Sequence, residues 1–432
     1  MQRLNKLIGH ITAETADEEQ NKLVSSWCIG ENENRQTDES SSKTFTRVTI
    51  KIAFPDNSMA DERYGGIGTI AFLEGELLKP KSQSKTVFIF MHPSGVQNLL
   101  PMPMAMARSG LHVVTCTSRY PNNDSCLIME KVLIDLSECI KHMKKHFGYE
   151  KIVLAGWSGG GSLSSFYQAQ AESNNRITCT PAGDAIDLSG LIPADGLLIL
   201  AAHTSRAKIF TEWIDPAVMD ESDPTVRDLE LDLWDTRNPN KPPFTKEYVA
   251  RFRQAQVDRN RRITRWAIAK LREVESQSQL GKDTWKRSNR DHPFVVRSTQ
   301  ADLRRIDVNL EPNGRVPTSL EELAAENHSS VGLARFTTCR SWLSQWSYDL
   351  SNADGVSSLR NVSVPVLVLE NGSDHLVPNS HPQQMYQAIP HNNKLYIRAD
   401  GATHYYYKQK ELMAEVILKM KAFLKEQRLW QE

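Results

Sequence analysis

The pattern of apolar and polar positions predicts a mostly parallel sheet flanked by helices. Stretches 46–54 and 67–78 alternate apolar with polar side chains, which is typical of half-buried strands. From residue 85 on, short continuous apolar runs alternate with helical stretches, the pattern of parallel strands covered on both faces. The strands predicted in this part are 87–91, 112–116, 152–155, 196–201, 364–369 and 394–397, and a closing helix is predicted over 408–425.

This alternation stops between about residues 203 and 350, a stretch too long for a plain loop in a compact domain. We therefore expect a large, mainly helical cap inserted after the sixth strand, with a helix over 245–275. The expected organisation is a polar N-terminal arm (1–45), the first part of an α/β core (46–203), the inserted cap (204–350) and the second part of the core (351–432).

Charge and cysteine content exclude several classes of protein. Lys+Arg 52 against Asp+Glu 52 gives a net charge of zero, so no basic field favours nucleic acid or an anionic membrane. The six cysteines form no CxxC pair, which argues against a zinc site and a disulfide framework. Residues 1–15 lack the unbroken apolar stretch typical of a signal peptide, and the sequence has no run of about 18 consecutive apolar residues. We expect a cytoplasmic protein that binds neither nucleic acid nor membrane.

The motif Gly156-Trp157-Ser158-Gly159-Gly160 carries the clearest chemistry. It is a G-x-S-x-G placed directly after a predicted buried strand and directly before a helix, the context in which this motif holds a serine nucleophile on a sharp turn. Glycine at both ends lets backbone pass close to backbone. A glycine-rich turn with an incidental serine is the alternative, but such a turn does not itself require serine.

A serine nucleophile needs a general base and a group that orients the base. Asp374 follows the predicted strand 364–369, and His404 follows the strand 394–397. Both therefore fall at the carboxyl edge of the sheet. Glu370 and Asp400 are alternatives for the acid, and His375 lies beside Asp374 in the sequence as a second histidine.

The chain order of Ser158, Asp374 and His404, with a long insertion after the first, resembles the α/β-hydrolase fold superfamily over 46–203 and 351–427. The resemblance implies an α/β-hydrolase fold, with these residues as nucleophile, orienting acid and general base. It also implies an oxyanion hole in which the amide of Gly159 is one donor.

The second oxyanion donor should come from the loop after the third strand, which in the superfamily usually begins His-Gly. Here the loop reads Met91-His92-Pro93-Ser94-Gly95. Because Pro93 has no N–H, Ser94 is the expected donor and Gly95 the fallback. We expect His92 to be structural.

Three further residues are candidates for substrate contacts: Trp157, Arg259 and Arg262. Trp157 belongs to the motif itself. The two arginines continue the apolar face of the predicted helix 245–275. They either pair with the acidic stretch 220–223 or reach the cleft and bind a substrate carboxylate or phosphate.

These features predict a serine hydrolase that forms an acyl-enzyme and cleaves an ester, lactone or related acyl bond of a medium-sized lipophilic or aromatic substrate. No cofactor or metal is expected, and the acidic stretch lacks a calcium-loop pattern. The alternatives are hydrolysis of a carbon–carbon bond in a diketone or vinylogous acid, and a non-catalytic ligand-binding protein of the same fold. The oligomeric state stays open, a homodimer included.

Overall fold

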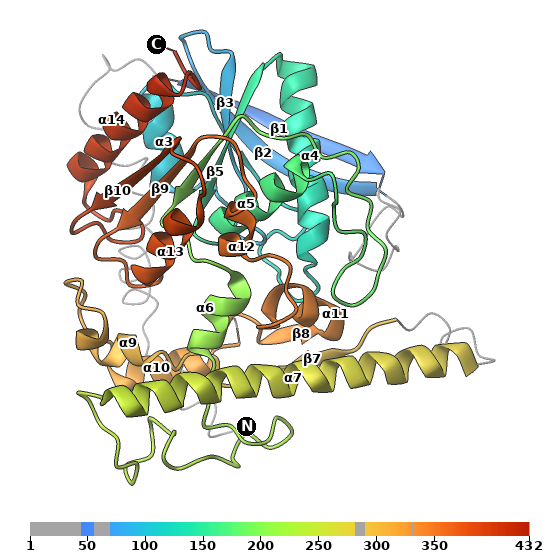
Figure 1. Ribbon diagram of the computed structural model, residues 1–432, viewed down its shortest axis with the longest axis vertical. Coiled ribbons are helices and arrows are strands. Elements are labelled where there is room, and N and C mark those ends of the chain that lie inside the picture. The colour runs from blue at the N-terminus through green and yellow to red at the C-terminus, as the bar shows by residue number, and fades with distance from the viewer. Residues whose placement is uncertain (1–44, 56–69, 281–289, 331, 432) are drawn as a thin grey trace, which may run out of the picture. The chain divides into compact units, whose positions relative to one another are not determined.

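An eight-stranded sheet in the order β1-β2-β4-β3-β5-β6-β9-β10 organises the chain (Figure 1). The computed structural model describes residues 45–55, 70–280, 290–330 and 332–431. The strands are β1 (Phe45–Pro55), β2 (Ile70–Pro80), β3 (Thr86–Phe90), β4 (Val113–Cys116), β5 (Lys151–Trp157), β6 (Gly196–Leu200), β9 (Val366–Asn371) and β10 (Lys394–Ala399). β1 and β2 form an antiparallel edge and β2 pairs antiparallel with β4, whereas the remaining pairs are parallel.

Helices cover both faces of the sheet, as its continuous apolar strands require. Every residue of β3, β6 and β9 is buried. The apolar core on one face includes residues of α4 (Met129–Phe147), α5 (Gly159–Glu172), α12 (Gly355–Leu359) and α13 (Ser380–Ala388). The core on the other face includes residues of α3 (Pro101–Arg108) and α14 (Lys410–Glu426). The strand order, the strand directions and this double cover confirm the predicted α/β-hydrolase fold.

The chain between β6 and β9 forms an inserted segment with apolar clusters of its own. Its longest element is α7 (Lys246–Leu280), the yellow helix of Figure 1. Its other elements are α6 (Arg206–Trp213), β7 (Pro293–Val295), α9 (Leu303–Ile306), η2 (Val308–Leu310), α10 (Leu320–His328), β8 (Phe336–Thr338), α11 (Cys339–Ser341) and the π-helical turn η3 (Trp342–Trp346). The small antiparallel sheet β7–β8 was not predicted, because each strand has only three residues.

The predicted boundaries at residues 203 and 350 stay predictions, since Phe45–Glu432 forms one compact unit. The predicted polar arm lies outside the described residues, apart from Phe45. Among the described residues, no helix combines the length and the apolar character needed to cross a bilayer.

Candidate active site

Ser158 stands on a strained turn between β5 and α5. Its backbone has φ 53° and ψ −120°, a conformation that is costly for a residue with a side chain. Two backbone hydrogen bonds hold it: the Ser158 N–H donates to the carbonyl of Leu200, and the Gly161 N–H donates to the carbonyl of Ser158, each at 3.0 Å. The turn therefore presents the Ser158 side chain at the carboxyl edge of the sheet.

The glycines of this turn are required by close backbone approach, as predicted. A Cβ at Gly156 would lie 2.3 Å from the carbonyl oxygen of Gly160. A Cβ at Gly160 would lie 2.5 Å from the carbonyl oxygen of Met91. Backbone atoms cannot give way as a flexible side chain can, so the strand, the turn and the helix fit together only with glycine at both positions.

His404 and Asp374 form a buried pair at the same edge. His404 Nδ1 lies 2.6 Å from Asp374 Oδ2, and both side chains are almost completely buried. The other carboxylate oxygen of Asp374 accepts hydrogen bonds from the amides of Leu376 (2.8 Å) and Val377 (2.9 Å). These amides fix the carboxylate, and the carboxylate in turn fixes the imidazole with its Nε2 directed away from Asp374.

The two alternative acids lie elsewhere. Asp400 is exposed and pairs with Arg398 at 2.6 Å. Glu370 is buried but accepts hydrogen bonds from Asn379 and Tyr396. Among the described residues, neither makes a hydrogen bond to His404. The ring of His375 lies edge-on to that of His404 with centroids 6.4 Å apart, and its pKa is lowered by burial.

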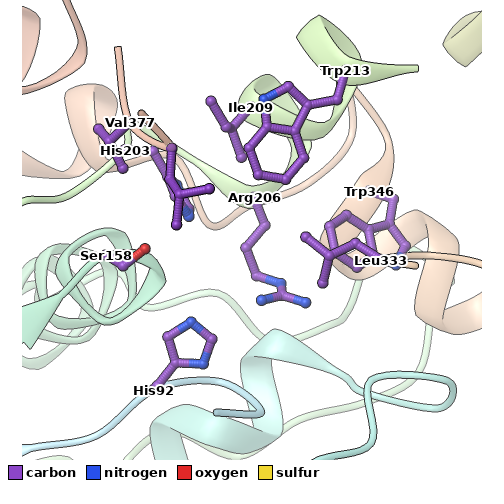
Figure 2. Close-up of a pocket in the computed structure, with 10 residues that line it drawn as sticks. His92, Ser158, His203, Arg206, Ile209, Trp213, Leu333, Trp346 and Val377 are labelled. Atoms are coloured by element: carbon purple, nitrogen blue, oxygen red, sulfur yellow. The ribbon is translucent and has the colours of Figure 1, made fainter. Parts of the chain in front are cut away.

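Ser158 opens onto a cavity of about 160 Å³ (Figure 2). The residues that line the cavity are His92, Ser158, His203, Arg206, Ile209, Trp213, Leu333, Trp346, Leu376 and Val377. Ser158 and His404 are not hydrogen-bonded to each other in the part of the chain that the structure describes. Catalytic hydrogen bonds of this kind are often long until a substrate is bound. Burial is the main cause of the lowered pKa values of His92 and His203, and His404 adds a smaller electrostatic effect in the same direction.

The two backbone N–H groups predicted as the second oxyanion donor, those of Ser94 and Gly95, already make hydrogen bonds within the protein. The amides of Ser94 and Gly95 donate to His92 Nδ1, at 3.1 Å and 2.6 Å. His92 thus holds its own loop in a closed turn. The prediction that Ser94 serves as a free oxyanion donor is not supported by this geometry, because its N–H already has an acceptor.

The same hydrogen bonds define the tautomer of His92. Since Nδ1 accepts, a neutral ring must carry its proton on Nε2. Burial and the nearby charges of Arg206 and His404 lower the pKa of His92 to about 3, so the ring is neutral near pH 7. A Cβ at Gly159 would lie 2.7 Å from His92 Nε2. The N–H of the imidazole therefore lies beside the backbone of Gly159, next to Ser158.

Of the two alternatives predicted for Arg259 and Arg262, the structure shows pairing with the acidic stretch 220–223, which corrects the candidate substrate contacts. Arg259 is fully buried and makes a bidentate pair with Glu221 at 2.8–2.9 Å. Arg262 donates to the same carboxylate at 3.2 Å and to the carbonyl of Val218 at 2.6 Å. Neither arginine lines the cavity. Glu221 of the acidic stretch thus supplies the counterion that the buried Arg259 requires, and the partly exposed Arg262 shares this carboxylate.

Trp157 also lies outside the cavity lining. It is buried, and its ring packs edge-on to that of His404 with centroids 5.8 Å apart. This contact braces the imidazole from the side. Trp157 therefore supports the site and does not form its wall.

Sequence reasoning missed the first turn after β6, which contributes His203 and Arg206 to the cavity. Both follow directly on the strand 196–200, at the edge where Asp374 and His404 also lie. That position was the available signal. Among the described residues, no group of three or more His, Cys, Asp or Glu side chains could hold a metal ion.

Comparison with known proteins finds solved structures that are similar to this chain. No model of a known family matches the chain, and no curated protein matches its sequence. Solved structures that match include DcsB in complex with a substrate analogue (13% identity, 88% of this chain and 99% of that chain, TM-score 0.47). The α/β hydrolase GrgF from Penicillium sp. sh18 (10%, 88% and 99%, 0.47) and Est1E from Butyrivibrio proteoclasticus (12%, 83% and 96%, 0.42) also match. At these low identities and TM-scores, the similarity carries no information about the function of this chain.

Proposed function

We propose that the protein is a serine hydrolase that cleaves an ester, lactone or related acyl bond through an acyl-enzyme on Ser158. The observation that carries the proposal is the buried pair of His404 Nδ1 and Asp374 Oδ2, 2.6 Å apart, at the edge where Ser158 stands on its strained turn. A serine, a base and an acid that orients the base are the parts that acyl transfer requires.

The chemistry follows from these positions. His404 Nε2 takes the proton of the Ser158 hydroxyl as Oγ attacks the carbonyl carbon. Asp374 stabilises the imidazolium that forms. The imidazolium then gives its proton to the leaving oxygen, and the acyl group stays on Oγ. Water, activated in the same way by His404, releases the acid and restores the hydroxyl. These steps need no cofactor.

The developing oxyanion would be held by the amide of Gly159 and by the Nε2–H of His92. Two observations support His92 in the place predicted for Ser94. Its Nδ1 accepts from the loop amides, so that Nε2 carries the proton, and Nε2 lies beside Gly159. A neutral imidazole donor costs little reorganisation when charge develops on the substrate.

The cavity walls favour a small apolar or aromatic group on the substrate. The apolar side chains that line it are Ile209, Trp213, Leu333, Trp346, Leu376 and Val377. Its volume of about 160 Å³ is close to that of engineered cavities, roughly 150 Å³, that bind benzene. The buried group is therefore about the size of one ring, and the rest of a medium-sized substrate would extend outside.

The test is labelling with a neutral fluorophosphonate, combined with turnover of an ester and lactone panel. Ser158→Ala should abolish labelling and lower kcat by several orders of magnitude, because the nucleophile is lost. Ser173→Ala, at the far end of the same helix, serves as the matched control and should behave like the wild type. Unchanged turnover in Ser158→Ala would refute the proposal. Product analysis of β-diketones separates acyl hydrolysis from carbon–carbon cleavage.

A further inference from the structure

Among the described residues that line the cavity, Arg206 is the one permanently charged side chain. The inference drawn from it rests on the proposed function. The other lining residues are apolar or are Ser158, His92 and His203. The pKa values of both histidines are lowered, chiefly by burial. The cavity therefore combines apolar walls, a nucleophile and a single cation. Figure 2 shows the guanidinium group between Ser158 and His92 on one side and Leu333 on the other.

The protein satisfies only part of this guanidinium. Arg206 Nε donates to Gln345 Oε1 at 3.1 Å, and Nη2 lies 3.3 Å from Asp124 Oδ2. The guanidinium carbon lies 4.4 Å from the centre of the Trp346 ring, so one face is stacked. Nη1 has no hydrogen-bond partner in the described part of the chain. The arrangement fixes the group in place and leaves one edge of it unused.

The charge of Arg206 is also incompletely balanced. Its side chain is 4% exposed, whereas that of Asp124 is 20% exposed. Burial lowers the pKa of Arg206 to about 10 despite the opposing effect of Asp124, and the group remains charged near pH 7. The contrast with Arg259 is informative, because that arginine has a bidentate carboxylate and three carbonyl oxygens. A buried cation with a weak counterion is suited to receive an anion from outside.

We propose that Arg206 binds a carboxylate of the substrate, so that the enzyme acts on small acyl compounds that carry an acid group besides the bond to be cleaved. A planar carboxylate matches the free edge of a guanidinium, and stacking on Trp346 pre-organises that edge. The apolar walls hold the carbon skeleton between this acid group and the reacting carbonyl. The alternative is that Arg206 only fastens α6 to the loop of Asp124 and to η3.

The experiment measures how far benzoate and benzamide protect Ser158 from a neutral fluorophosphonate. The two probes have the same size and differ in charge. In the wild type, benzoate should protect at a concentration at least roughly tenfold lower than benzamide, since a charged hydrogen bond contributes more than a neutral one. Arg206→Gln should remove this difference, and Arg206→Lys should keep part of it. Each variant is its own reference for the labelling rate without probe.

Two further variants keep the proposal testable if Arg206→Gln does not fold. Asp124→Asn removes the competing carboxylate and should strengthen protection by benzoate alone. Arg261→Gln, which breaks an exposed pair with Asp349, should change neither probe. Equal protection by both probes in a labelled wild type, or unchanged benzoate protection in both Arg206→Lys and Asp124→Asn, would overturn the role of Arg206. A wild type that is not labelled at all would instead overturn the proposed function.

Discussion

In the proposed mechanism, Asp374 acts on the reaction only through the orientation and charge of His404. Asp374→Asn keeps the shape of the side chain but loses the charge and favours the wrong imidazole tautomer. We expect kcat to fall on the order of 10⁴-fold with little change in KM, since binding in the cavity is left intact. Steady-state kinetics on the best ester found in the panel measure both constants.

Asp400→Asn is the matched control for this prediction, because Asp400 also follows a strand end but is exposed and pairs with Arg398. It should behave like the wild type. A large loss in Asp400→Asn together with a small one in Asp374→Asn would show that another acid orients the base in solution.

For single residues, the sequence predicted that Ser158, Asp374 and His404 lie at strand ends, because the end of an apolar run marks the end of a strand. The sequence did not predict the hydrogen bonds of the loop amides. Whether the N–H of Ser94 is free depends on the rotamer of His92, which no pattern of residue types encodes. The sequence also placed the candidate arginines of the cleft, Arg259 and Arg262, on a long helix. The arginine that lines the cavity is Arg206, the first residue of the short helix α6.

The loop that follows β3 acts as one element, because His92 closes it and also faces the cavity. His92→Leu removes both the acceptor for the amides and the Nε2–H donor. Loss of one oxyanion donor typically lowers kcat by about 10²–10³-fold. His92→Gln should recover part of that loss, since an amide side chain offers one acceptor and one donor group, as the neutral imidazole does. Measurement of kcat and KM for both variants checks this.

His112→Leu is the control for a purely structural role. His112 is a buried histidine whose ring nitrogens contact Tyr149 and the carbonyl of Ser82, and it does not line the cavity. Its loss should lower the melting temperature without a matching loss in kcat. If His92→Leu shows this same pattern, the second oxyanion donor lies elsewhere.

At the scale of elements, the predicted strands lie within a few residues of the observed ones because every central strand is a continuous apolar run. The inserted segment was less predictable. Residues 214–245 contain no helix or long strand. Asp215 and Asp232 accept hydrogen bonds from backbone amides two residues further on, and Arg227 pairs with both carboxylates. Such turns have a local polar signature but no periodicity.

Across the whole molecule, buried ion pairs join the helices of the inserted segment. Asp302, before α9, lies 2.6 Å from both Arg253 of α7 and Arg304 of α9. Arg304 also lies 2.6 Å from Glu212 of α6. Burial alone would raise the pKa of Asp302, but the charges of Arg304 and Arg253 outweigh it and hold the pKa at about 2.

These ion pairs of Asp302 predict how the free energy of unfolding depends on pH. The pKa of Asp302 is lower in the folded chain than its ordinary 3.8, so the unfolded chain binds the proton first as the pH falls. The stabilisation by ionised Asp302 is therefore complete above about pH 5 and declines toward pH 2. By about pH 3 the loss should be about 1 kcal/mol in the free energy of unfolding.

The Asp302→Asn variant has no carboxylate at this position, so it does not lose this stabilisation as the pH falls. The difference in free energy of unfolding between wild type and Asp302→Asn, measured with urea, should therefore narrow by about 1 kcal/mol from about pH 5 to about pH 3. Asp349→Asn breaks the exposed pair with Arg261, and its difference from the wild type should be small at both pH values, because solvent screens such pairs. A difference for Asp302→Asn that stays constant over this range would mean that Asp302 is not held ionised by its arginines. The insertion would then owe its acid stability to other groups, Glu212 first among them, whose pKa is also lowered by Arg304 against the effect of burial.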